Sequence, residues 1–185
     1  MTRKSWTSHS EESRSPEDVL GILKEKLQDR LEAFELRPKK EAGREEHPLI
    51  HDIWITVRKD AFLSLVDELF FFDFPHFHVL STDDSGDHIL FVYHFSLFRS
   101  AGRGKHLGVN VRVRIPKEDL TMPSLWERIP GVEYSEREAR EILGVAFEGL
   151  PNQSPLLLPE NWDTSIKPMR RDETGPREEH IRHLS

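Results

Sequence analysis

The chain contains no cysteine among its 185 residues. Disulfide bonds, thiolate nucleophiles and cysteine-ligated zinc or iron–sulfur centres are therefore excluded within it. If the protein serves electron transfer, other chains must carry the redox centres.

Long hydrophobic runs and a basic charge balance are also missing. The longest apolar stretch, residues 89–98, is too short to span a bilayer and contains His94 and Ser96. The N-terminus lacks the apolar region of a secretory signal. A net charge of −7 disfavours a general nucleic-acid binder and a polybasic membrane-surface protein. These features predict a cytoplasmic protein.

What is present is a pattern of helices and strands that follows a polar segment, residues 1–14, which is expected to be disordered. Ser15 and Pro16 predict a helix start, and leucines at helical spacing extend the expected helix to Phe34, before Pro38. A charged linker then completes residues 15–48.

Residues 49–57 predict a strand and residues 60–71 a second helix. Three further strands are expected at residues 77–82, 88–98 and 107–115, joined by hairpin connections. The last of them alternates valines with polar side chains, which indicates one buried face and one face that is exposed to solvent or to a partner. The fold class predicted is α+β, a mostly antiparallel sheet covered by helices on one side.

The last third of the chain is organised differently. Ser124 is expected to cap a short helix, and Ser135 a second one in which Glu138 completes a capping box and Gly144 ends the helix. We place the core domain at residues 49–145. Residues 146–185 combine many prolines with large apolar side chains, which predicts an extended C-terminal arm lying in a groove. Ordering its backbone costs on the order of 1–2 kcal/mol per residue, more than burial of its eight large side chains returns at roughly 1.5–3 kcal/mol each. The groove could belong to its own domain or to another protein, and we favour another protein.

No motif of an active site is present. His76 and His78 share a strand face, but a His-x-His pair without a third ligand favours a structural role over metal binding. His88, His94 and His106 could approach one another across the hairpins, and surface roles are preferred for them too. Glu136 and Arg140 could pair on a helix surface, whereas Arg137 and the run at residues 170–172 have no explanation inside a helix.

Four ordered motifs stand in the last third of the chain. They are Glu136-Arg137-Glu138, Leu143-Gly144-Val145-x-Phe147-Glu148-Gly149-x-Pro151, Leu157-Leu158-Pro159-Glu160-x-Trp162 and Pro168-Met169-Arg170-Arg171-Asp172. In these motifs the sequence resembles a known family, the 30 kDa subunit of respiratory complex I (NADH-quinone oxidoreductase) and the related subunit of energy-converting membrane-bound [NiFe] hydrogenases. The resemblance covers residues 49–173.

The resemblance implies a subunit without a cofactor or an active site of its own, on the cytoplasmic side of a membrane-bound oxidoreductase. Its partners would be an iron–sulfur small subunit and a large subunit with a quinone site or a NiFe centre. It would hold them together for electron transfer coupled to ion translocation. The interface residues implied are Glu136, Arg137, Glu138, Phe147, Gly149, Pro151, Trp162, Pro168, Arg170, Arg171 and Asp172.

Several positions depart from the family pattern. Leu150 stands where a histidine is common, Glu141 where complex I has an aspartate, and Met169 and Arg171 replace leucine and lysine. These departures favour the hydrogenase-like branch. An alternative function is a free-standing binding or regulatory module that uses the basic hairpin, residues 99–114, for an acidic ligand. A hydrolase or transferase is the least favoured class.

Overall fold

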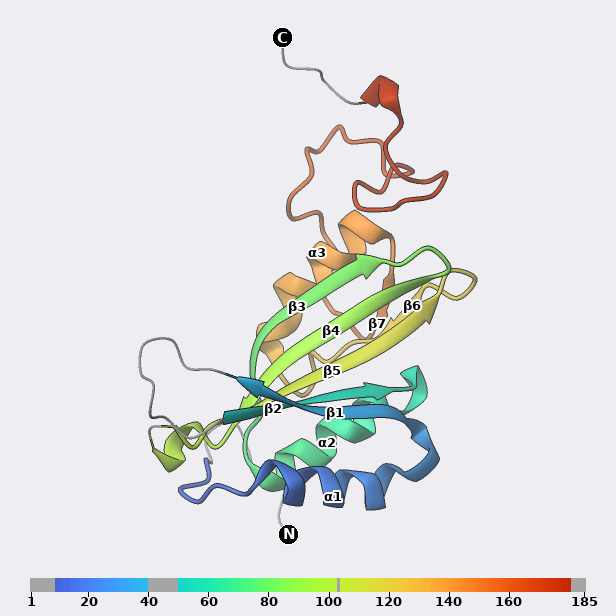
Figure 1. The fold of residues 1–185 in the computed structure, drawn as a ribbon. Coiled ribbons are helices and arrows are strands. Elements are labelled where there is room, and N and C mark those ends of the chain that lie inside the picture. The colour runs from blue at the N-terminus through green and yellow to red at the C-terminus, as the bar shows by residue number, and fades with distance from the viewer. Residues whose placement is uncertain (1–8, 40–49, 103, 181–185) are drawn as a thin grey trace. The chain divides into compact units, whose positions relative to one another are not determined.

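The computed structural model describes residues 9–39, 50–102 and 104–180. The chain divides into two units, and each is described by itself. The first unit comprises residues 1–79 and 92–113, and the second comprises residues 80–91 and 114–185. Five strands hydrogen-bond in the order β1-β2-β5-β4-β3 (Figure 1). The helices and strands in chain order up to the end of this sheet are α1 (Pro16–Leu27), β1 (Leu31–Lys39), β2 (Ile50–Val57), α2 (Phe62–Phe72), β3 (His76–Asp84), β4 (His88–Leu97) and β5 (Leu107–Pro116).

The sheet is mostly antiparallel, as the sequence predicted. β1 pairs with β2 in antiparallel register, while β2 and β5 run parallel. Antiparallel strands need only a short turn between them, and β3 is joined to β4 by a tight turn in which the Ser85 N–H donates to the His88 carbonyl at 3.0 Å. The predicted α+β class is therefore confirmed.

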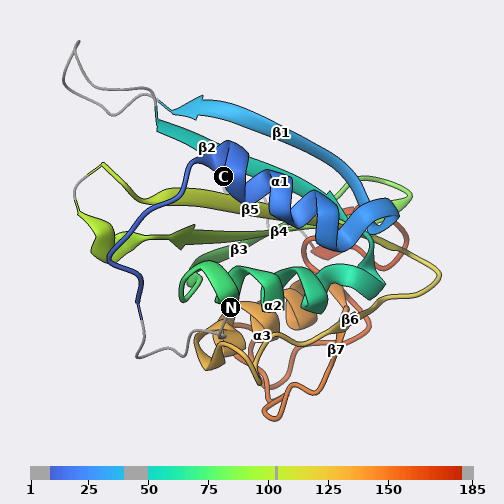
Figure 2. The ribbon, with the colours of Figure 1, turned by 90° about the horizontal axis from the view of Figure 1, so that it is seen from below.

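In the first unit, α1 and α2 lie on the same face of the strands (Figure 2). Side chains alternate along a strand, so every second residue of β2 and β5 turns toward these helices. The alternating residues Ile53, Ile55, Val109, Val111 and Val113 are each fully buried. Fully buried Leu23 of α1 and Phe62 of α2 belong to the same apolar core. The opposite face carries polar and aromatic side chains.

The first helix is shorter than its leucine pattern predicts. The Ser15 hydroxyl accepts a hydrogen bond from the Asp18 N–H at 3.0 Å, which confirms the predicted cap. The helix ends at Leu27, and Gln28 takes a positive φ of 47°. Leu31 and Phe34 lie in strand β1, so the predicted continuation of the helix was wrong. The backbone there hydrogen-bonds to β2 instead, and Pro38 is tolerated because β1 is an edge strand.

The segment preceding α1 was expected to be disordered, and residues 1–8 lie outside the described part of the chain. Residues 9–14 are tied to the first unit. The Ser10 N–H donates to the buried Asp73 carboxylate at 2.8 Å, and the Arg14 guanidinium lies 5.6 Å from the centre of the Phe72 ring. The charged linker falls at residues 40–49, also outside the described residues.

The remaining elements of the second unit are β6 (Thr121–Pro123), α3 (Glu133–Leu143) and β7 (Ala146–Glu148), with β6 and β7 paired in parallel. Two predicted helix caps in this unit were wrong. Ser124 opens a hydrogen-bonded turn and not a helix, and Ser135 lies inside α3. Pro130 begins a 3-10 turn that leads directly into α3, so the helix begins before Ser135 and does not need its side chain as a cap. Gly144, with a φ of 79°, ends the helix as predicted.

Candidate functional site

The C-terminal arm was predicted to begin at residue 146, but Ala146–Glu148 form strand β7, so the arm is described over residues 149–180. Within these described residues it forms no regular helix or strand apart from a 3-10 turn at Glu178–His180. A segment of this kind needs partners for its backbone polar groups. Some of these partners lie within the arm, as in the bond from the Lys167 N–H to the Thr174 carbonyl at 2.7 Å, and others come from α3 and from Asp84 at the end of β3. All of these residues belong to the second unit (Figure 1).

Glu141 of α3 holds the first part of the arm. Its carboxylate accepts backbone hydrogen bonds from Leu156 at 3.2 Å, Leu157 at 2.8 Å and Leu158 at 3.0 Å. Burial by itself would raise the pKa of Glu141. The three N–H donors and the charge of Arg137 outweigh that effect, and the pKa lies below its ordinary value. The side chain therefore stays ionised and accepts hydrogen bonds from three consecutive backbone amides.

Arg137, one helical turn before Glu141, holds the preceding carbonyl groups. Its guanidinium donates to the Ser154 carbonyl oxygen at 3.2 and 3.1 Å and to the Pro155 carbonyl oxygen at 3.1 Å. The side chain is only 9% exposed. Glu133, four residues earlier on the helix, lies 3.5 Å from the guanidinium. Arg137 and Glu141 thus bind the carbonyls and then the amides of one continuous stretch of the arm.

Glu136 fixes α3 to the turn that precedes it. Its carboxylate is fully buried and accepts hydrogen bonds from the Ser124 hydroxyl at 2.5 Å and the Leu125 N–H at 2.9 Å. Burial raises the pKa of Glu136 to about 7, because the two hydrogen bonds offset only part of the cost of desolvating the charge. The predicted surface pair with Arg140 is therefore wrong. Arg140 instead donates to the Gln153 carbonyl at 3.0 Å.

A second anchor holds a later part of the arm through a group of charged side chains, of which Asp84 and Arg170 are buried and Lys117 and Asp172 half-buried. Lys117 lies 2.8 Å from a carboxylate oxygen of the fully buried Asp84 and 2.7 Å from one of Asp172. Arg170 donates to Asp172 and, at 3.2 Å, to the Leu143 carbonyl at the end of α3. The Arg171 N–H donates to Asp84 at 2.8 Å.

The carboxylates of this anchor are stabilised in their charged form. Burial would raise the pKa of Asp84, but the Arg171 N–H and the Lys117 ammonium lower it below the ordinary value. The pKa of Asp172 is also lowered, because hydrogen bonds from Lys117, Thr174 and Arg170 outweigh its burial. Both acids therefore remain ionised beside their cations at neutral pH.

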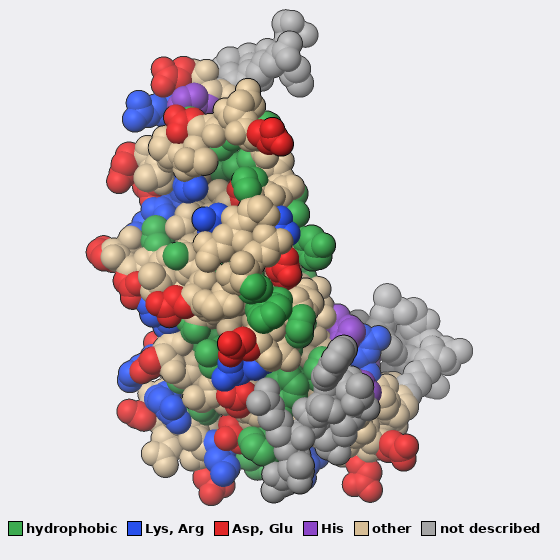
Figure 3. Space-filling model, turned by 180° about the vertical axis from the view of Figure 1, so that it is seen from behind, with side chains coloured by type: hydrophobic (Ala, Val, Ile, Leu, Met, Phe, Trp, Pro, Cys, Tyr) green, Lys and Arg blue, Asp and Glu red, His purple; other side chains and the backbone are tan. Residues whose placement is uncertain are grey.

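The two anchors leave part of the apolar surface of the second unit exposed. The side chains of Leu157 and Met169 in the arm are 58% and 56% exposed, and Tyr134 on α3 is 65% exposed. A groove of about 460 Å³ runs between the end of α3 and the arm, with Val145, Leu158 and Trp162 in its walls. Figure 3 shows apolar side chains reaching the surface between charged ones.

The interface residues implied by the resemblance fall into two groups. Glu136, Arg137, Phe147 and Arg170 are buried within the second unit. The rest are exposed or half-buried, namely Glu138, Gly149, Pro151, Trp162, Pro168, Arg171 and Asp172. The buried residues therefore act inside their own unit, where Arg137 and Arg170 fix the arm, Glu136 fixes α3, and Phe147 packs against Phe91.

Four supporting residues were not identified as such from the sequence, one at the turn before α3 and three in the two anchors. Ser124 was assigned to a helix cap, Glu141 was noted only as a replacement for aspartate, and Asp84 and Lys117 were not singled out. Asp84 lies 87 residues from Arg171, so no local pattern connects them. The only local signal was the position of Glu141, four residues after Arg137 on one face of a helix.

Solved structures of other proteins share this fold, among them the following two. A chain of the membrane-bound sulfane sulfur reductase, an archaeal respiratory membrane complex, superposes with a TM-score of 0.64 at 20% identity, over 83% of this chain and 82% of the other. A trypsin-resistant fragment of Nqo5 superposes with a TM-score of 0.50 at 17% identity, over 74% and 97% of the two chains. The fold is thus one found in a subunit of a respiratory membrane complex.

The family follows from the sequence match. Residues 55–179 match the family described as the 30 kDa subunit of respiratory-chain NADH dehydrogenase, and the chain belongs to this family. This confirms the resemblance seen in the four C-terminal motifs.

Relatives come from both branches of the family's enzymes. The membrane-bound hydrogenase subunit beta of Pyrococcus furiosus is 29% identical over 71% of this chain and 75% of its own length. A subunit of the NADH-quinone oxidoreductase of Chloroherpeton thalassium is 32% identical over 88% of this chain and 63% of its own length. Formate hydrogenlyase subunit 5 of Escherichia coli is 33% identical over 40% of this chain, which spans only 13% of it. Among the described residues, no helix has the length and apolar character needed to cross a bilayer.

Proposed function

We propose that this chain is a structural subunit of a membrane-bound oxidoreductase related to complex I and the membrane-bound hydrogenases. In this role it holds an iron–sulfur small subunit and a large catalytic subunit together on the cytoplasmic side. The observation that carries the proposal is the arm. It is fixed along an irregular path by buried charged groups, and it presents Leu157 and Met169 to the outside.

The free energy spent on burying charges to hold the arm favours a role in assembly. Burying ion pairs is weak evidence for stability, because the desolvation penalty offsets the attraction between the charges. Here the charges set the course of a segment that has little core of its own. An ordered apolar surface loses less conformational entropy on binding than a flexible one, so a prearranged arm suits a permanent interface.

The chemistry of the chain supports a role without redox centres of its own. Iron–sulfur clusters are held mainly by cysteine thiolates, and the sequence has no cysteine. Electron transfer depends on fixed distances between centres, so the contribution proposed is to hold the partner subunits in register.

The hydrogenase-like branch is our preferred placement. Met169 and Arg171 stand in the arm where the complex I family usually has leucine and lysine. The chain also spans a larger share of the Pyrococcus furiosus hydrogenase subunit than of the Chloroherpeton thalassium oxidoreductase subunit.

Affinity purification of the tagged chain from native membranes in mild detergent tests the proposal. We expect stoichiometric recovery of an iron–sulfur small subunit and a large subunit, identified by mass spectrometry. A set of nickel-ligating cysteines in the large subunit would support the hydrogenase placement. Recovery of the chain alone, or only with proteins that are not membrane-bound, would overturn the proposal and favour the free-standing binding module.

A pair of matched variants locates the contact. Leu157→Glu combined with Met169→Glu places two charges on the exposed apolar surface of the arm and should abolish co-purification. Phe34→Glu introduces the same kind of change at a side chain that is 48% exposed in the first unit, and it should leave co-purification intact. Equal recovery of partners by both variants would show that the arm is not the interface.

A further inference from the structure

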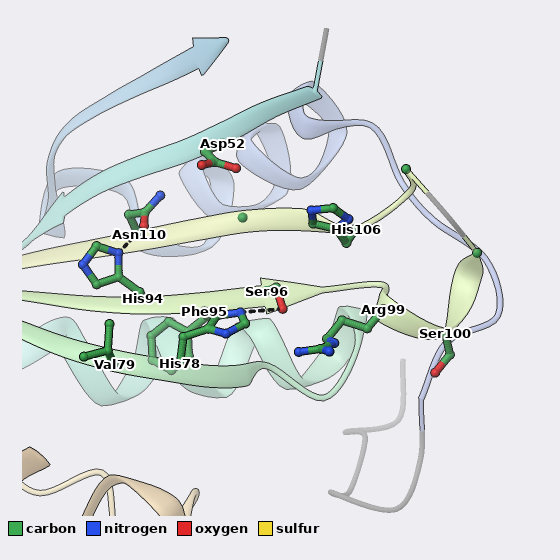
Figure 4. A pocket seen from close by; sticks show the side chains of 13 residues that line it. Asp52, His78, Val79, His94, Phe95, Ser96, Arg99, Ser100, His106 and Asn110 are labelled. Carbon is green, nitrogen blue, oxygen red and sulfur yellow. Dashed lines mark hydrogen bonds between the residues drawn. The ribbon is translucent and has the colours of Figure 1, made fainter. Parts of the chain in front are cut away.

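A cavity of about 770 Å³ opens in the first unit, lined by residues of β2, β3, β4 and β5 and of the loop after β4. Asp52, His94 and Asn110 alternate with core residues along their strands, so they lie on the sheet face opposite α1 and α2. His78, Arg99 and His106 complete the polar lining. Figure 4 shows these side chains gathered around one hollow.

The polar groups on this face are held in set orientations. The Asn110 Nδ2 donates to the Ile53 carbonyl at 3.5 Å, which directs Oδ1 toward His94. The His94 Nδ1 lies 2.6 Å from that oxygen and must donate to it, because an amide oxygen only accepts. His78 Nε2 is paired with the buried Ser96 hydroxyl at 2.9 Å. The imidazoles are thus positioned by the sheet.

Gly108 makes room for the one carboxylate of the cavity. A Cβ atom at this position would lie 2.2 Å from Asp52 Oδ1, much closer than any contact permits. Any larger residue would therefore displace the Asp52 side chain.

Arg99 supplies a fixed positive charge to the same cavity. Its side chain extends back along the strands toward His78 (Figure 4). Within the part of the chain that the structure describes, its guanidinium forms no ion pair. The pKa of the neighbouring His76 is lowered, first by burial and then by the positive charge of Arg99. A guanidinium in this setting is available to an anion from outside.

We propose that this cavity binds a carboxylate group that carries a hydrogen-bond donor beside it. The guanidinium of Arg99 would receive the carboxylate in two parallel hydrogen bonds. Asp52 would accept from the neighbouring N–H or O–H, and its negative charge disfavours a doubly charged phosphate. Acidic amino acids and acidic protein segments both present this combination.

Carboxylate binding in this cavity goes beyond the proposed function and does not depend on it. The cavity lies in the first unit, and the arm belongs to the second. The basic hairpin considered as an alternative binding element contributes Arg99, His106 and Asn110 to the cavity. Arg112, in contrast, is used elsewhere, because it stacks on Trp54 at 4.4 Å and pairs with Glu35 at 3.1 Å.

Titration of the full chain with two probes tests the proposal. The first is N-acetylglutamate, and the second is a blocked decapeptide of alternating glycine and glutamate. Binding would be measured by calorimetry and by the imidazole proton signals in NMR spectra. We expect the signals of His78, His94 and His106 to shift, while His88, which pairs with Asp87 at 2.6 Å outside the cavity, stays unchanged.

Variants make the test specific. Arg99→Gln should weaken binding at least roughly tenfold, which corresponds to about 1.4 kcal/mol. The matched control His88→Gln should bind as the unchanged chain does. Gly108→Ala should weaken binding by displacing Asp52, and its circular dichroism spectrum and melting temperature show whether the fold is retained.

The outcomes separate the two sources of the carboxylate. Binding of both probes supports a small-molecule carboxylate, and binding of the peptide alone supports an acidic protein segment. The proposal is overturned if neither probe binds at about 10 mM, a concentration that still detects a millimolar Kd. Equal affinity of Arg99→Gln and the unchanged chain would overturn it as well.

Discussion

The two units of this chain are stabilised in different ways. The first unit has a conventional apolar core, in which the leucines of α1 and the aromatic residues of α2 pack on alternating side chains of the sheet. The second unit has buried apolar residues too, such as Phe91, Met122 and Val145, but its arm is also held by charged side chains. Glu141, Arg170 and Asp84 each bind backbone groups or another charged group of this unit. The difference shows that an irregular segment can be ordered when charged side chains satisfy its backbone.

The largest expected effect is in the apolar core. Phe62→Ala removes a fully buried ring that packs 4.5 Å from Tyr93. We expect the free energy of unfolding to fall by about 4 kcal/mol, because a cavity is left behind. Chemical denaturation measures the loss. Leu157→Ala is the control, since its exposed side chain should change stability by less than about 0.5 kcal/mol.

The buried charges of the second anchor come next. Asp84→Ala removes the fully buried carboxylate beside Lys117 and Arg170 and leaves Asp172 as their remaining anion, which should cost about 3 kcal/mol. Hydrogen exchange of the arm amides should rise with it. Arg171→Gln is the control, because its exposed pair with Asp83 contributes about 0–1 kcal/mol. A loss as large for Arg171→Gln would contradict the distinction between buried and exposed pairs.

The pH dependence of stability should reveal Glu136. Its folded pKa of about 7 lies above the ordinary glutamate value of 4.5, so the folded chain binds more protons between these values. Stability contributed by this group is present below about pH 4.5 and falls as the pH rises to about 7, by up to roughly 3 kcal/mol. Glu136→Gln, which stays neutral, should be the more stable variant at pH 8 and similar at pH 4.5. Melting curves of both proteins, recorded across this pH range, test the assignment. If the two melting temperatures change with pH in parallel, the assignment to Glu136 is contradicted.

The smallest of these effects concerns the first anchor. Glu141→Gln removes the charge and one of the two acceptor oxygens that three backbone N–H groups share. We expect a loss of about 2 kcal/mol, confined to the arm. Amide exchange at Leu156, Leu157 and Leu158 should speed up while β2 and β5 stay protected. Glu138→Gln, on the exposed side of the same helix, serves as the control.

The sequence predicted the first unit well because its signals are local. Strand alternation at Val109, Val111 and Val113 and the cap at Ser15 depend on neighbouring residues alone. The error at Leu31 and Phe34 has the same origin, because a short apolar pattern fits a helix and an edge strand alike. Pairing with β2 decided between them.

The candidate site was predicted only in part. The C-terminal motifs drew attention to Glu136, Arg137 and Arg170, but their internal roles were not foreseen. The cavity beside Arg99 was not predicted either, although the hairpin at residues 99–114 had been considered as a binding element for an acidic ligand, and His94 and His106 as neighbours. Their approach depends on strand register and on the space left by Gly108, which no sequence pattern encodes.

The sequence by itself determined the absence of thiolate chemistry, the α+β class and the family, because composition, periodicity and ordered motifs are written along the chain. Only the tertiary structure decided where the arm is anchored and which charges are buried. Asp84, Lys117 and Asp172 meet from positions far apart in the sequence. Their ionisation and their strength as anchors depend on desolvation and distance, and both of these exist only in the folded chain.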